Sequence, residues 1–409
     1  MIEKKKILVL TSSFPRWKND NHTGGGQFII NLSKGFLNTF EIFVLAPYFH
    51  GAKVKEKLFG FNIRRFRQNP FKNANLSYSG SGILPALKKN KFLYLLIPFY
   101  LIFQFYALKK TVNEEKIKIL HAHWIFPQGL VAVVYKKLFN KKIKILATIN
   151  GSDFWGFNNV FGKTLKKFVL KNVNCVTVPN TDVKVGIEKM GIKAQIHILP
   201  MGLDTSFFNK DKKELSLKKE LNINGPFLLF VGALVEDKGI KYLFKSMVKI
   251  VLVYPKAVLV VIGKGYLEEE LKLFAKENNI ENNIRFIDEY IPDEDLPKYF
   301  ATSDVFILPT LSEGFPIAFM EAISSSTYTI VSDIPVFKSL LENHKISTLV
   351  RVKNSEDIYE KTIEILENFV KFSPTKAKAR DYVVANHDWK IVQKNYLSLL
   401  LKLTVDNHA

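Results

Sequence analysis

The chain has 409 residues, of which 47% are hydrophobic and 24% charged, and it contains a single cysteine. This composition is typical of a folded protein and excludes a disordered chain, an internal disulfide and a thiolate metal site. The length suits two domains of roughly 200 residues each, and the lone Cys175 favours a reducing compartment.

The net charge of +21 is unevenly distributed along the chain. Residues 1–205 contain 32 Lys and Arg against 10 Asp and Glu, a net charge of +22, whereas the remainder contains 27 against 28, a net charge of −1. This asymmetry indicates an anionic partner for the N-terminal half, with solubility of a lysine-rich chain as the alternative. No nucleic-acid-binding motif accompanies the basic residues, so an anionic membrane surface is favoured over nucleic acid.

Short, apolar, β-rich segments alternate with helical patterns along the chain. The first of them has too few apolar residues for a secretory signal, which predicts a cytosolic protein. The predicted strands are 7–11, 42–46, 117–121, 143–149, 174–178, 196–199, 227–232, 257–262, 284–287, 304–308, 328–331 and 348–352. Strands that alternate with helices predict parallel sheets covered on both faces.

The pattern divides near Pro200–Lys213, where a polar, lysine-rich stretch follows an apolar strand. We therefore expect two doubly wound α/β domains, 1–205 and 206–385, and a last helix within 386–409, at about Trp389–Leu403. Doubly wound sheets bind ligands at the carboxyl ends of their strands, so the loops from strand to helix are where function is expected.

Phe92–Leu108 is a 17-residue, nearly continuous apolar segment with lysines on both sides. A membrane-spanning helix needs about 20 such residues, and this segment contains Pro98 and Gln104. Three interpretations follow, favoured in this order: a core or half-buried helix, a helix on a membrane surface, and a true span.

The richest candidate site follows the predicted strand at 304–308, where a loop holds Glu313 and a helix begins near Pro316. Proline favours the first turn of a helix, and the N–H groups of that turn can bind an anion. Glu321 lies up to about 12 Å further along the helix axis. Two carboxylates so separated can hold two hydroxyl-bearing groups of one extended ligand; a surface acidic pair around a helix start is the alternative.

The Glu-x7-Glu pattern from Glu313 to Glu321 resembles the signature of glycosyltransferase family 4, retaining enzymes of GT-B fold. Further segments resemble the family's motifs in the family's order and cover nearly the whole chain. They are Ser13-Phe14-Pro15 with Gly24-Gly25-Gly26, His121-Ala122-His123-Trp124, Thr148-Ile149-Asn150-Gly151-Ser152-Asp153, Leu199-Pro200-Met201-Gly202-Leu203-Asp204, Phe230-Val231-Gly232-Ala233-Leu234-Val235-Glu236-Asp237-Lys238-Gly239 and Val261-Ile262-Gly263-Lys264-Gly265.

The resemblance implies two Rossmann-like domains that face a central cleft. Residues 1–205 would bind the acceptor and 206–385 the nucleotide sugar, and the helix in 386–409 would cross back to the first domain. Nucleic acid is not expected as a partner.

By this resemblance, Glu313 would contact the transferred sugar, Glu321 the donor ribose and Lys238 the diphosphate. A lysine there neutralises the charge that develops on the leaving diphosphate, and glycine lets backbone N–H groups approach phosphate closely. The implied donor-binding residues are Gly25, Gly26, Lys238, Gly314, Phe315, Pro316 and Glu321.

No cofactor is expected besides the nucleotide-diphosphate sugar, which is a co-substrate, and the lysine makes a metal optional. The one Asp-x-Asp pattern, Asp293-Glu294-Asp295, precedes a helical pattern. It is interpreted as the acidic N-terminus of a helix rather than as a metal site.

The sequence departs from the family pattern in four places. Asn150 stands where the family has a histidine; it can hydrogen-bond a hydroxyl but cannot become cationic or transfer a proton. Ala233 replaces the arginine beside the diphosphate. Ser326 lies in a segment that usually holds Gly and Pro, and Pro335–Ser339 lacks the family's glycine pair. Asn150 is still placed with Glu313 and Lys238 among the expected catalytic residues.

His123 and Asp153 are candidates for the acceptor side; the alternatives are a packed strand-end histidine and a helix cap. The expected activity is retaining transfer of a hexose to a hydroxyl of a glycan or lipid-linked glycan, in polysaccharide or glycolipid assembly. The expected location is cytoplasmic, at the inner face of the membrane. The alternative is a degenerate family member that binds a sugar nucleotide or a partner without turnover.

Overall fold

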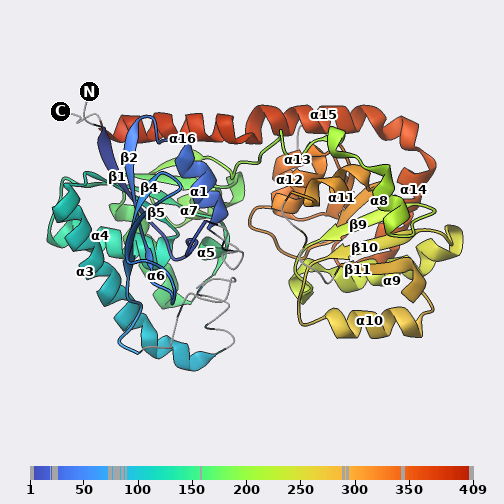
Figure 1. Ribbon diagram of the computed structural model, residues 1–409, viewed down its shortest axis with the longest axis horizontal. Helices are drawn as coiled ribbons and strands as arrows, with labels where there is room; N and C mark the ends of the chain where they lie inside the picture. Colours follow the sequence, from blue (N-terminus) through green and yellow to red (C-terminus); the bar gives the residue numbers. More distant parts are fainter. Residues whose placement is uncertain are drawn as a thin grey trace. The chain divides into compact units, whose positions relative to one another are not determined.

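The structure is a computed structural model that describes residues 4–18, 20, 26–71, 76, 83, 87, 90–156, 159–287, 291, 294–341 and 346–404. The chain forms two compact units (Figure 1), an N-terminal unit of Met1–Gly202 with Trp389–Ala409 and a C-terminal unit of Leu203–Asp388. The two boundaries between the units, after Gly202 and after Asp388, each lie three residues from the expected boundaries after residues 205 and 385. The cleft expected between the domains stays a prediction.

The N-terminal unit is built on a mainly parallel sheet. Within the described residues its strand order is β3-β4-β2-β1-β5-β6-β7-β8. The strands are β1 Lys5–Leu10, β2 Phe40–Pro47, β3 Lys55–Leu58, β4 Phe61–Phe66, β5 Ile119–His123, β6 Lys144–Thr148, β7 Cys175–Val178 and β8 Gln195–Ile198. The order reverses between β1 and β5, and a doubly wound sheet binds its ligand outside the carboxyl ends of such a pair.

Helices cover both faces of this sheet, because its central strands are apolar on both sides. Leu8 and Leu10 of β1 lie in one apolar cluster, with residues of α3, α4 and α6. Ile7 and Val9 lie in another, with residues of α1 and α16. Among the described residues, the α-helices of the unit are α1 Gln27–Lys34, α3 Ile97–Glu115, α4 Leu130–Leu138, α5 Ser152–Trp155, α6 Val160–Asn172, α7 Thr181–Lys189 and α16 Trp389–Thr404. A 3-10 helix, η1 Lys91–Leu96, leads into α3.

The hairpin of β3 and β4 is absent from the predicted strands. Its two strands are antiparallel and lie at one edge of the sheet. The prediction missed β4 because Arg64 and Arg65 interrupt its apolar pattern. Both arginines are accommodated by ion pairs, Arg64 Nη2 with Glu115 and Arg65 Nη2 with Glu56, each at 2.7 Å.

The C-terminal unit contains a second sheet, with the order β11-β10-β9-β12-β13-β14 within the described residues. All its neighbouring strands are parallel. Its strands are β9 Phe227–Val231, β10 Val258–Ile262, β11 Ile284–Ile287, β12 Val305–Leu308, β13 Tyr328–Ser332 and β14 Thr348–Val350. Its helices are α8 Leu215–Glu220, α9 Ile240–Val253, α10 Glu268–Glu277, α11 Leu296–Thr302, α12 Ile317–Ser324, α13 Pro335–Leu341, α14 Ser355–Glu367 and α15 Phe369–His387. The order reverses between β9 and β12.

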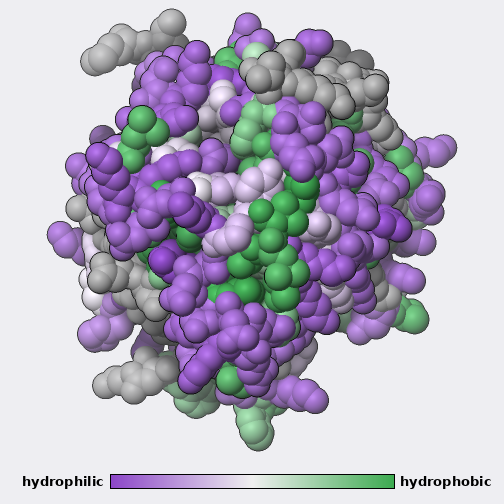
Figure 2. Space-filling model, turned by 90° about the vertical axis from the view of Figure 1, so that its right-hand side faces the viewer, coloured by the Kyte–Doolittle hydropathy of each residue, from purple (hydrophilic) through white to green (hydrophobic). Residues whose placement is uncertain are grey.

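Every predicted strand segment overlaps an observed strand, so the predicted α/β class with two doubly wound sheets is confirmed. The apolar runs that predicted the strands form the core. The face in Figure 2 is mostly hydrophilic, with a narrow band of hydrophobic side chains across it. Apolar side chains contribute a large share of the surface of most folded proteins.

The last helix, α16, packs within the N-terminal unit. Gln393 Nε2 donates a hydrogen bond to the Asn31 carbonyl oxygen of α1 at 2.6 Å. Tyr396 is buried and its hydroxyl donates to Thr177 Oγ1 of β7 at 3.2 Å. A chain segment from the C-terminus thus completes the N-terminal core.

Candidate functional site

Lys238 and Glu313 lie together in the C-terminal unit. Lys238 belongs to the short helix η4 (Glu236–Lys238), which follows β9, and Glu313 lies in the loop that follows β12. Because β9 and β12 are parallel neighbours where the strand order reverses, their carboxyl ends meet at the same edge of the sheet. The Lys238 ammonium and the Glu313 carboxylate form a partly buried ion pair.

Two hydrogen bonds fix the loop of Glu313 to the helix of Lys238. The buried Thr310 hydroxyl lies 2.9 Å from the carbonyl oxygens of both Asp237 and Ser312 and can donate to either. The Leu311 N–H donates to the Asp237 carbonyl oxygen at 2.8 Å. Thr310 therefore positions Glu313 relative to Lys238. Nothing in the sequence signals this role, because the partner of Thr310 lies 73 residues away in the chain.

Gly239 lets the two loops approach each other. It has a φ of +65°, in the left-handed region, and a Cβ there would overlap the Pro309 carbonyl oxygen. Only glycine meets both conditions without strain. Its place directly after Lys238 was the available sequence signal, since the segment resembling the family motif ends on it.

Replacing Thr310 with valine is expected to reduce turnover about tenfold, because Glu313 is then held less firmly in its productive position. Loss of the hydrogen bond should also destabilise the unit by about 1 kcal/mol. Turnover and thermal unfolding would be measured for Thr310→Val and for Thr310→Ser, which keeps the hydroxyl and should behave like the wild type. Wild-type turnover in Thr310→Val would contradict the positioning role.

The remaining predicted donor residues of this unit follow β12. Gly314, Phe315 and Pro316 complete the loop, and α12 begins at Ile317, one residue after the predicted start. Phe315 is partly buried and its ring centroid lies 5.9 Å from that of His387. Glu321 lies on α12 and is partly buried. The structure thus brings these residues to the same sheet edge as Lys238.

The glycine loop of the N-terminal unit is described only in part. Gly25 lies outside the described residues. Gly26 immediately precedes α1, and a Cβ on it would lie 3.1 Å from Pro15 Cδ and 3.2 Å from Phe14 Cα. Glycine thus permits close approach between the loop and the segment that resembles the family's first motif. The expected contact with phosphate stays a prediction.

Asp153 supports the loop of Asn150. Its carboxylate accepts hydrogen bonds from the N–H groups of Asn150 and Ile125, at 3.0 and 2.9 Å. Burial raises the pKa of Asp153 to about 6, although these hydrogen bonds and the ammonium of Lys166 act in the opposite direction. Asp153 lies within α5 and joins two loops, which corrects the interpretation that it caps the following helix. The buried carboxylate thus acts as a positioning residue for Asn150.

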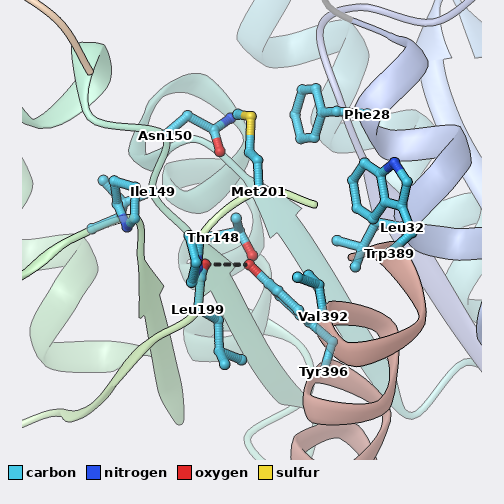
Figure 3. A pocket seen from close by; sticks show the side chains of 12 residues that line it. Phe28, Leu32, Thr148, Ile149, Asn150, Leu199, Met201, Trp389, Val392 and Tyr396 are labelled. Atoms are coloured by element: carbon cyan, nitrogen blue, oxygen red, sulfur yellow. Dashed lines mark hydrogen bonds between the residues drawn. The ribbon is translucent and has the colours of Figure 1, made fainter. Parts of the chain in front are cut away.

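The Asn150 side chain borders a small cavity of about 10 Å³ that Phe28, Met201 and Trp389 also line (Figure 3). Its Nδ2 is buried and has no hydrogen-bond partner among the described residues. A buried amide donor without a partner is costly, and a cavity of this size is barely large enough for one water molecule. The expected contact of Asn150 with the transferred sugar stays a prediction.

His123 packs in the interior. Its ring is fully buried and lies against that of His121, with the centroids 4.3 Å apart. Burial lowers the pKa of His121 to about 3, and burial together with His121 lowers the pKa of His123 well below its ordinary value. Of the two interpretations of His123, the structure supports the packed strand-end histidine. A fully buried ring cannot contact an acceptor directly.

The acidic segment before α11 is partly described. Asp295 directly precedes the helix, as predicted, whereas Asp293 lies outside the described residues. Within the part of the chain that the structure describes, no three His, Cys, Asp or Glu side chains are grouped so as to hold a metal ion. Metal independence stays a prediction.

Two family models match the chain in succession. The model described as Glycosyltransferase Family 4 matches residues 23–207, and the model described as Glycosyl transferases group 1 matches residues 211–382. A curated relative is the UDP-Gal:alpha-D-GlcNAc-diphosphoundecaprenol alpha-1,3-galactosyltransferase of Escherichia coli. It is 24% identical over 277 residues, which cover 64% of this chain and 70% of the relative.

Solved structures resemble the whole chain. Sucrose-phosphate synthase from Thermosynechococcus elongatus has a TM-score of 0.78 at 17% identity, covering 98% of this chain and 99% of that one. Anabaena Alr3699/HepE in complex with UDP has a TM-score of 0.76 at 13% identity, covering 97% and 100%. At these identities the likeness shows the GT-B fold. Because the two family models together span residues 23–382 with only a short gap, the chain belongs to the family 4 and group 1 glycosyltransferases.

Proposed function

We propose that the protein transfers a hexose from a nucleotide-diphosphate sugar to a hydroxyl of a lipid-linked glycan, with retention of the anomeric configuration. The observation that carries the proposal is the Lys238–Glu313 ion pair where the strand order reverses in the C-terminal sheet. The relatives support the choice of substrates: HepE is solved with UDP, and the E. coli enzyme is named for a UDP-sugar donor and a diphosphoundecaprenol-linked acceptor.

The ion pair suits a donor that carries both a diphosphate and a sugar. When the diphosphate binds, the Lys238 ammonium would turn to the phosphate oxygens, and the Glu313 carboxylate would accept hydrogen bonds from sugar hydroxyls. Transfer breaks the bond between the sugar C1 and the diphosphate oxygen. The electron pair of that bond leaves with the diphosphate. The acceptor hydroxyl oxygen bonds to C1, and its proton goes to the departing phosphate oxygen. Lys238 would stabilise the growing negative charge without a metal.

The proposed location is the cytoplasmic side of the membrane, in polysaccharide or glycolipid assembly. The net charge of +22 on residues 1–205 supports attraction to anionic lipid. The free, buried Cys175 suits a reducing compartment.

The test is release of nucleoside diphosphate from a panel of sugar nucleotides, with native lipid extract as the source of acceptor. We expect release from one donor class only, and only when the extract is present. NMR of the product would then give the anomeric configuration. Inversion at C1, or no release with any donor, would overturn the proposed reaction.

A degenerate, non-catalytic member is the second candidate, because Asn150 and Ala233 replace residues that the family uses. Calorimetry separates the two: sugar-nucleotide binding without release from any donor would favour the degenerate binder. In that case Asn150→His combined with Ala233→Arg should restore release. Turnover by the wild-type chain excludes this candidate.

A further inference from the structure

A stripe of large apolar side chains is exposed on one side of η1 and α3, which lie at the periphery of the N-terminal unit (Figure 1). Leu95, Phe99, Ile102 and Tyr106 recur at the spacing i, i+4, i+7 and i+11, which places them on one helix face. Phe92 adds a fifth member; Phe92 and Leu95 lie in η1 and the other three residues in α3. These five residues are called the apolar stripe below.

The opposite side of α3 is fixed in the core. Tyr100, Gln104 and Leu108 are buried there, and the Tyr100 ring lies against that of Phe66 with the centroids 5.2 Å apart. The helical segment Lys91–Glu115 has 25 residues and contains an 18-residue stretch with a mean hydropathy of 1.6, which by length and composition alone would suffice for a membrane span. A span would pull Tyr100 and Leu108 out of the core, so the structure argues against a true span. The exposed side of the helix, which carries the stripe, is available to a partner.

The charge around the stripe is positive. Residues 91–110 contain no Asp or Glu, and lysines stand at both ends, Lys91 at the start and Lys109 and Lys110 at the finish. Apolar and aromatic side chains between cationic ends are typical of a helix that lies in a membrane interface. A second copy of this chain would bring a second strongly basic half against the first, so charge argues against self-association through the stripe.

We propose that the apolar stripe docks on an anionic phospholipid surface, with the axis of α3 parallel to the bilayer and the stripe inserted at the boundary of headgroups and acyl chains. Lys91, Lys109 and Lys110 then lie beside anionic headgroups. This deepens the proposed function, because it places the N-terminal unit on the surface that would hold a lipid-linked acceptor. Binding itself requires neither donor nor turnover.

The test is co-sedimentation of the full chain with phosphatidylcholine vesicles, with and without phosphatidylglycerol. We expect binding only with phosphatidylglycerol, and weaker binding as salt is raised. Leu95→Ser with Ile102→Ser should weaken partitioning about a hundredfold, about tenfold for each apolar side chain. Both residues are exposed, Leu95 at 71% and Ile102 at 51%, so the variant should fold.

The matched control changes the same number of exposed aliphatic residues in the C-terminal unit. Leu252→Ser with Leu273→Ser alters side chains that are 79% and 57% exposed on α9 and α10. We expect wild-type binding to vesicles from this variant. An equal loss in test and control variants, or unchanged binding in the test variant, would refute the docking surface.

Two further measurements are needed. One distinguishes a membrane from a second copy of the chain as the partner of the stripe, and the other tests the docking surface independently of the proposed function. Sedimentation velocity without lipid should give the same mass for wild type and test variant; a wild-type dimer that dissociates in the variant would assign the stripe to a second copy instead. Vesicle binding by a wild-type chain that releases no nucleoside diphosphate would leave the docking surface standing and reject the proposed function.

Discussion

Replacing Glu313 with glutamine is expected to reduce sugar transfer by about 100- to 1000-fold, the usual loss when one charge-stabilising group is removed from a reaction centre. Glutamine keeps the size of the side chain but lacks the negative charge that pairs with Lys238 and would face the sugar. Binding of the bare nucleoside diphosphate should change little, because that ligand has no hexose. Release assays give the first quantity and calorimetry the second.

Glu236→Gln is the matched control for that substitution. Glu236 lies on the same short helix as Lys238, and its carboxylate pairs with Lys241 at 2.7 Å rather than with the candidate site. Its loss should leave transfer unchanged. Transfer at the wild-type rate by Glu313→Gln would show that Glu313 is not part of the site. An equal loss of transfer in both variants would show that the loss comes from the change in local charge and not from a specific role of Glu313.

The strands were predictable because continuous apolar runs have few other interpretations. The meeting of Lys238 and Glu313 was not predictable from periodicity, since it depends on β9 and β12 being neighbours in the sheet. Order along the chain does not give order across a sheet; the resemblance to a known family supplied it. The β3–β4 hairpin was missed because Arg65 of β4 finds its carboxylate partner, Glu56, only in the folded sheet.

The sequence also could not predict which side chains of the N-terminal unit face the core and which face a ligand. His121 and His123 must share one face of β5, because side chains alternate along a strand. Whether that face meets ligand or core is decided by two helices. The Phe28 ring of α1 lies 5.4 Å from the His123 ring, and the Tyr396 ring of α16 lies 6.0 Å from the His121 ring, centroid to centroid. A motif marks the position of a histidine, but helices distant from it in the chain determine that this face of β5 is covered.

Replacing Lys238 with methionine is expected to weaken binding of nucleoside diphosphate about tenfold to a hundredfold and to reduce transfer further. Methionine keeps most of the length of the side chain and removes the charge. The lost attraction to phosphate is one cause. A second is that Glu313 is left partly buried without its cation, and its negative charge would then repel the diphosphate.

The contribution of the unpaired Glu313 carboxylate can be measured separately, because it predicts that a second substitution, at Glu313, improves nucleoside diphosphate binding. Lys238→Met with Glu313→Gln should bind nucleoside diphosphate more tightly than Lys238→Met alone, since the unpaired carboxylate is gone, although transfer stays low. Lys241→Met, which removes a cation paired with Glu236 and Glu270, serves as the control and should bind like the wild type. If the two substitutions at the site add independently in the double-mutant cycle, the ion pair is not part of the diphosphate site. A recovery of binding would locate the diphosphate beside Glu313, where the reversal of strand order in the C-terminal sheet predicts it.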